Sequence, residues 1–227
     1  MNFFTKIKLY IIVLIFSCNL IFAKSGFEAI LNIPFGITLS YPNETLKNLG
    51  YKMSPNLDAS VLLQTGYMFS IVENFSISAL GEIGYSYDSF SVYKKENDIS
   101  NIISCFTHNI QLGILSKFNI KQYSIGIGGG MKFPMYVNYL VKNNNSIVSK
   151  DSIKTADIKN YFDSVFSWYV KASIDYYVFF TDILALNIGA YFLYDFGLKG
   201  KKEYNNTIGF SSFDVGIQIG FRFGPKP

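Results

Sequence analysis

Cysteine and histidine are almost absent from this chain: two cysteines, Cys18 and Cys105, and one histidine, His108, occur among 227 residues. If Cys18 is removed with a secretion signal, Cys105 stands alone and no intrachain disulfide can form. No cluster of metal ligands, phosphate-binding loop or nucleotide motif occurs in the sequence. The sequence therefore predicts no cofactor, no metal site and no catalytic residue, and we expect that the protein is not an enzyme.

An excess of charge and long apolar runs are also missing. The formal net charge of +4 falls to +2 once Lys6 and Lys8 leave with the signal, and this excess is too small to indicate nucleic acid as a partner. Beyond residue 23, no apolar run approaches the ~20 residues that a membrane-spanning helix needs. Hydrophobic residues nevertheless make up 49% of the chain and aromatic residues 18%, so another kind of element must carry them.

Residues 1–23 have the pattern of a secretory signal peptide. A positive n-region is followed by an apolar h-region and by a cleavage site that ends at Ala23. An alternative stays open, because residues 15–18 are similar to a loose lipobox in which Cys18 would be acylated. We predict cleavage after Ala23, which leaves residues 24–227 as a single domain.

What the chain has in abundance is strict alternation of apolar and polar residues. From Phe27 to Tyr41 every second residue is apolar, which predicts one extended strand with two different faces. This run is much longer than the usual strand of ~5–6 residues. The pattern returns seven more times. The eight predicted strands span about 26–41, 56–70, 75–88, 104–118, 123–137, 164–178, 183–198 and 210–223.

The connections between these strands alternate in length. Tight turns are predicted near 71–74, 119–122 and 179–182, and longer polar loops near 42–55, 89–103, 138–163 and 199–209. Short periplasmic turns and long extracellular loops are typical of outer-membrane barrels. Because the strand count is even, both ends of the domain are expected on the periplasmic side.

Alternation alone does not say which face of a barrel points outward, since soluble lipocalin-like barrels hold apolar side chains inside. Three features favour an apolar exterior: the apolar faces are too bulky for an eight-stranded interior, the polar faces are rich in Gly and Ser, and aromatic residues gather at both strand ends. We predict an all-β, eight-stranded, antiparallel up-and-down transmembrane β-barrel. A soluble periplasmic lipocalin-like binder is the alternative.

The pattern over residues 26–223 resembles the small eight-stranded outer-membrane proteins of the OmpX and OmpA-transmembrane-domain type. Asp214, Gly216, Ile219 and Phe221 resemble the assembly signal in the last strand of that family. The sequence departs from it by continuing through Phe223 into a short tail. The resemblance implies a porin-like bacterial protein in the cell outer membrane, with outer-membrane lipid and the barrel-assembly machinery as partners.

The predicted inward face carries charges of both signs, which are Glu28, Asp58, Glu82, Asp88, Lys117, Lys132, Lys171, Asp175, Asp195, Asp214 and Arg222. Glu28 and Arg222 both lie near the end of the barrel that carries the tight turns, on strands that become neighbours when the barrel closes. We therefore predict an ion pair between them. Buried charges need partners, which favours a structural network. The alternative is an ion pathway gated by rearranging pairs.

His108 lies on the outward phase of the fourth strand near the loop end, where a small lipid-modifying barrel enzyme would carry a histidine. Asn109 and Ile110 follow it, so no serine lies two residues away on the same face. We therefore favour an interfacial histidine without a catalytic role and treat the enzyme as an alternative. The expected function is a structural or surface-interaction role, by adhesion or ligand contact, through lysine-bearing extracellular loops that would meet anionic headgroups or a host or surface ligand.

Overall fold

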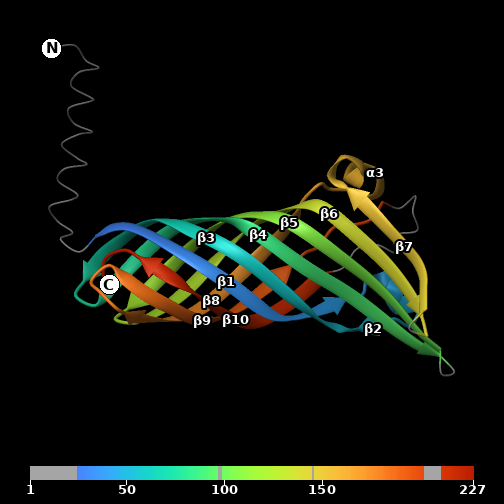
Figure 1. Ribbon diagram of the computed structural model, residues 1–227, viewed down its shortest axis with the longest axis horizontal. Helices are drawn as coiled ribbons and strands as arrows, with labels where there is room; N and C mark the ends of the chain where they lie inside the picture. The colour runs from blue at the N-terminus through green and yellow to red at the C-terminus, as the bar shows by residue number, and fades with distance from the viewer. Residues whose placement is uncertain (1–24, 97–98, 145, 202–210) are drawn as a thin grey trace, which may run out of the picture.

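The computed structural model describes residues 25–96, 99–144, 146–201 and 211–227. Eight long antiparallel strands form a barrel wall (Figure 1), which confirms the predicted fold class. They are β1 (Gly26–Tyr41), β3 (Pro55–Val72), β4 (Phe75–Glu96), β5 (Ile99–Ile120), β6 (Tyr123–Asn143), β8 (Ser167–Phe179), β9 (Leu184–Asp195) and β10 (Ser211–Phe223). The predicted signal peptide, the lipobox alternative and most of the predicted loop 199–209 lie outside the described residues.

The wall closes because β1 pairs with β10 as well as with β3. Each of the other barrel strands pairs with its neighbours in the chain order. We follow the paired residues from strand to strand, starting at Ile37 of β1 and passing through β10 once around the barrel. The path returns to β1 at Phe27 instead of Ile37. The strands are therefore staggered and tilted against the barrel axis. Closure gives the backbone N–H and C=O groups of both edge strands hydrogen-bond partners. A sheet in lipid needs these partners, because the hydrocarbon layer offers none.

The two ends of the barrel differ as predicted. At the turn end, where the C-terminus lies in Figure 1, the tight connections follow β3, β5 and β8. Asn74 and Lys121 take positive φ values of 64° and 54° in the first two of these turns. The opposite end, which we call the loop end, carries the long connections and reaches farthest along β4, β5 and β6.

The loop end is more ordered than the sequence indicated. The predicted loop 89–103 is largely a continuation of β4 and β5, and the predicted loop 138–163 contains the rest of β6 and further short elements. These elements are β7 (Ser146–Lys154), which pairs with β6, the 3-10 helix η1 (Thr155–Asp157) and the helix α3 (Ile158–Tyr161). The predicted loop 42–55 holds the helix α2 (Glu44–Asn48) and the short strand β2 (Lys52–Met53), which pairs with β4. We call the part of β4, β5 and β6 beyond Tyr87, His108 and Tyr136, together with β7, the extension.

The outside of the barrel is apolar, and the inside is polar. Ile114, Ile127 and Ile217 are among the most exposed large apolar side chains, with exposed fractions of 76%, 61% and 68%. Aromatic side chains border this surface at both ends, with Phe69, Phe118 and Tyr123 at the turn end and Tyr85, Trp168 and Phe196 at the loop end. The soluble alternative requires an apolar cavity, and the observed faces are the reverse.

No helix among the described residues is long and apolar enough to cross a membrane.

Candidate functional site

Charged side chains that alternate along the strands meet inside the barrel and fill it. All the predicted inward charges are buried, and Lys117 and Arg222 are completely so. Small residues make room for larger neighbours across the lumen: a Cβ atom on Gly113 would overlap the hydroxyl group of Tyr169. The network consists of four groups of contacts, described from the turn end to the loop end.

At the turn end, the predicted pair is present. Arg222 donates from Nε to Glu28 Oε1 at 2.5 Å, with both side chains fully buried. The guanidinium group also lies 4.9 Å from the centre of the Tyr177 ring. Its Nη2 donates to the carbonyl oxygen of Pro225 at 2.8 Å, so the tail beyond β10 folds back against this end of the lumen. No pattern of residues in the tail predicts this contact.

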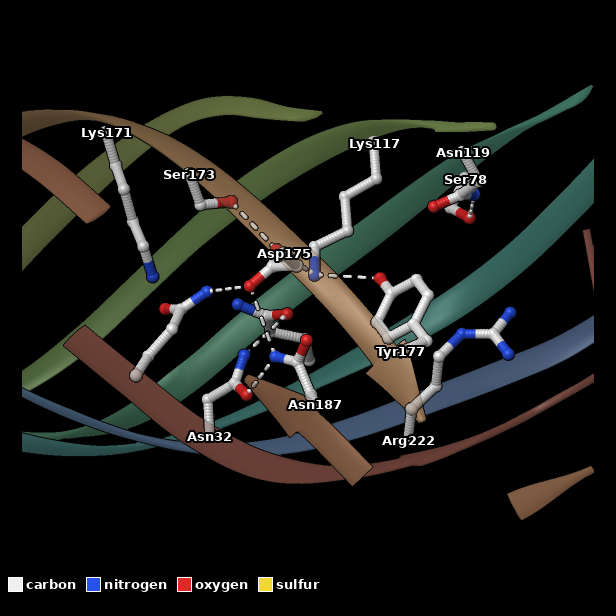
Figure 2. A network of polar contacts seen from close by, with 12 residues as sticks. Asn32, Ser78, Lys117, Asn119, Lys171, Ser173, Asp175, Tyr177, Asn187 and Arg222 are labelled. Carbon is white, nitrogen blue, oxygen red and sulfur yellow. Dashed lines mark hydrogen bonds and ion pairs between the residues drawn. The ribbon is translucent and has the colours of Figure 1, made fainter. Parts of the chain in front are cut away.

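Next to this pair and linked to it through Tyr177, Lys117 and Asp175 form a second buried pair, 2.9 Å apart (Figure 2). Lys117 also lies 3.2 Å from the hydroxyl group of Tyr177. The carboxylate of Asp175 accepts further hydrogen bonds from the amides of Asn187 and Gln218. Every charge at this level therefore has both an opposite charge and neutral hydrogen-bond partners.

In the middle of the barrel, Glu82 accepts from four donors on three strands. Lys171 lies 3.1 Å from its carboxylate, Gln64 and Gln111 each donate at 2.7 Å, and the hydroxyl group of Tyr169 donates at 2.9 Å. These contacts tie separate parts of the wall to β4, which carries Glu82, because β3 and β5 each supply one donor and β8 supplies two.

Counting residues from the turn end predicts Glu82, Lys132, Lys171 and Asp214 at middle depth, near Asn109 and Gln111. Glu82 contacts Lys171 and Gln111, whereas Lys132 pairs with Asp88 and Asp195.

Toward the loop end, Lys132 bridges Asp88 and Asp195 at 2.8 and 2.9 Å. Asn109 also donates to Asp88 at 2.8 Å. Asp58 accepts a hydrogen bond from Thr38 and, together with Asp214, lines a cavity of about 20 Å³. A cavity of this size holds about one water molecule. The lumen is thus filled by side chains, which supports the structural reading of the charges over an open ion pathway.

The loop end has an apolar core of its own, which we call the cap cluster. Its buried members are Leu46, Phe90, Val92, Ile103, Cys105, Val137, Ile153, Ile158 and Phe162. They come from α2, from α3 and the residue that follows it, and from the inward side of the extension. Phe90, Cys105 and Phe162 line one cavity with Asp88 and Asp195, so the cluster adjoins the charged lumen. Burial raises the pKa of Cys105 to about 12, and its thiol is therefore protonated and inert at neutral pH.

His108 lies on the outside of β5, on the predicted phase. Its Nδ1 is 2.5 Å from the hydroxyl oxygen of Tyr85, and its ring centre lies 5.2 and 6.0 Å from those of Tyr87 and Tyr136. The structure therefore brings His108 together with tyrosines, while a hydrolytic site needs a hydroxyl nucleophile and a carboxylate in reach. Within the described parts of the chain, no three potential ligands among His, Cys, Asp and Glu are placed to hold a metal ion.

No family model and no curated protein matches the sequence. Among solved structures, the chain is similar to the attachment invasion locus protein Ail of Yersinia pestis in complex with the heparin analogue sucrose octasulfate, at 12% identity over 87% of this chain and 99% of that chain, with a TM-score of 0.44.

Two further solved structures are similar over a comparable length. Neisserial surface protein A matches at 12% identity over 88% of this chain and 98% of that one, with a TM-score of 0.40. The outer membrane protein OprG of Pseudomonas aeruginosa matches at 12% identity over 89% and 98%, with a TM-score of 0.35. The geometry of the present chain itself, a closed eight-stranded barrel that is apolar outside and charged inside, is that of a bacterial outer-membrane β-barrel protein.

Proposed function

We propose that the protein has a structural and surface-interaction role in the outer membrane, in which a closed barrel holds an ordered loop end toward the medium. One observation carries this proposal: the lumen is filled, and the loop end has an apolar core of its own. A filled lumen does not favour transport. A rigid platform outside the membrane favours contact with another surface or ligand.

A basic rim beside α3 is the part of this platform best suited to a ligand in the medium. A bridge between Phe162 and Gly200 brings the segment after β9 against the end of α3. Lys159 and Lys201, together with the single carboxylate Asp163, border one open cavity of about 420 Å³ on this rim. Because exposed ammonium groups attract anionic polymers, a polyanionic surface ligand is the class that this rim fits.

The test uses whole cells that display the full-length protein and immobilised heparin as a polyanionic probe. Cells with the wild-type protein are expected to bind above cells that lack it, and Lys159→Glu with Lys201→Glu is expected to abolish the difference. Lys47→Glu with Lys121→Glu reverses the same amount of charge elsewhere and serves as the matched control. Binding unchanged in the rim variant, or lost equally in the control, would contradict the proposed contact.

A further inference from the structure

The outward side of the extension forms a second basic surface, which faces sideways along the membrane. Register places Phe106 opposite Asn138 and Leu140 opposite Lys150, so these side chains share the face that His108 occupies lower on β5. The outward positions of β5, β6 and β7 in the extension contain three lysines, Lys142, Lys150 and Lys154, and no carboxylate within the described residues. Asp151 lies on the opposite phase of β7.

A groove crosses this surface. It has a volume of about 350 Å³ and is bordered by Tyr87, Phe106 and His108 on one side and by Lys142 and Lys150 on the other. The side nearer the membrane is therefore aromatic, and the side away from it is basic. Neither lysine forms an ion pair with a carboxylate in the part of the chain that the structure describes.

The height of the groove decides what can reach it. On β5, exposed apolar side chains run from Phe118 to Ile110 and end at His108. This stretch matches the ~9–11 residues with which a tilted strand crosses the hydrocarbon layer. Tyr85, Tyr87 and His108 therefore lie at the level where aromatic girdles meet the headgroups. The groove opens just beyond that level, beside the headgroups of the outer leaflet.

We propose that this groove binds the phosphate-bearing headgroup of an outer-leaflet lipid, with Lys142 and Lys150 facing the phosphate and the aromatic side facing the start of the acyl chains. An amphiphile fits both halves of the groove, whereas a soluble polyanion fits only the basic half. Each lysine near an anionic lipid surface favours binding by roughly fivefold, so the pair contributes roughly thirtyfold. This site faces the lipid rather than the medium and does not depend on the rim beside α3.

The experiment is native mass spectrometry of the full-length protein in detergent micelles titrated with lipid A, with phosphatidylcholine as the neutral reference. The wild-type protein is expected to retain lipid A in preference to phosphatidylcholine. Lys142→Ala with Lys150→Ala is expected to weaken retention by roughly thirtyfold. Lys142→Arg with Lys150→Arg keeps the charge and is expected to keep the lipid.

The matched control is Lys47→Ala with Lys121→Ala, which removes two exposed lysines away from the groove and is expected to bind lipid A like the wild type. A shift of electrophoretic mobility on boiling shows that each variant is folded. Equal retention of both lipids by the wild type, unchanged retention in the groove variant, or an equal loss in the control would overturn the proposal. If inorganic phosphate alone stabilised the wild-type protein against heat as much as lipid A does, the assignment of the groove to a lipid would be overturned.

Discussion

At the scale of single residues, the barrel interior shows how a narrow lumen tolerates many charges. A buried ion pair is costly to desolvate, and it survives only when further hydrogen bonds satisfy both partners. Glu82 has one lysine and three neutral donors, and Asp175 has Lys117 and two amides. The network therefore depends on neutral residues such as Gln64 and Asn187 as much as on its charges.

Removing one member of the Glu28–Arg222 pair should cost more than removing both. Arg222→Met leaves the carboxylate of Glu28 buried without its cation, which is expected to lower the free energy of unfolding by about 3–5 kcal/mol. Glu28→Leu combined with Arg222→Met removes the uncompensated charge and should restore most of that loss. The measurement is urea unfolding in lipid vesicles, followed by the fluorescence of Trp168, which is the one tryptophan of the chain.

A single variant as stable as the wild type would show that the pair is not needed. A double variant as unstable as Arg222→Met would show instead that the loss comes from the contacts of the guanidinium group with Tyr177 and the tail.

Among individual contacts, the sequence predicts those that depend on closure alone. Glu28 and Arg222 are both near the turn end of strands that must pair, so their meeting follows from counting residues. The bridging of Asp88 and Asp195 by Lys132 depends on the stagger of the strands around the barrel, which no local pattern contains. The contact of Pro225 with Arg222 depends on a tail that has no alternation at all.

At the scale of elements, the apolar phase of a strand reverses where the strand leaves the membrane. On β4 the apolar side chains Ile83 and Tyr85 point outward, whereas Phe90 and Val92 point inward into the cap cluster. Lipid surrounds the first pair, and water surrounds the extension, so the apolar face changes side. The end of the outward apolar phase predicts the end of a strand. The strand continues with its apolar face reversed, and the loop predicted over 89–103 is therefore wrong.

The cap cluster should unfold without the barrel, because its core is separate from the paired charges below it. Phe162→Ala removes a buried aromatic side chain from this cluster and is expected to destabilise the cap by about 3–5 kcal/mol. Limited trypsin digestion of the protein in vesicles should then cut within the extension faster, while the unboiled barrel keeps its folded mobility. Phe180→Ala changes an exposed phenylalanine at the turn end and should leave the digestion unchanged.

If the Phe162 variant is digested at the wild-type rate, the cluster does not hold the extension. If it also loses the folded mobility, the cap and the barrel form one cooperative unit.

At the scale of the whole molecule, one property organises the others: the apolar face of every barrel strand points outward. It follows that the lumen must hold the polar side chains, that the sheet must close, and that aromatic residues border the exposed apolar surface at both ends. The period of two in the sequence predicts the strands and their faces. It does not predict the ordered loop end, because the polar composition of those segments conceals inward residues such as Ile153 and Ile158.

The most direct test of this outward apolar face is the electrophoretic mobility of the protein in SDS, recovered from the outer-membrane fraction and loaded with and without boiling. A barrel whose apolar face meets lipid should stay folded in SDS, migrate differently when unboiled, and shift on heating. Recovery in the soluble periplasmic fraction, with the same mobility before and after boiling, would contradict the outward apolar face and place the apolar side chains inside.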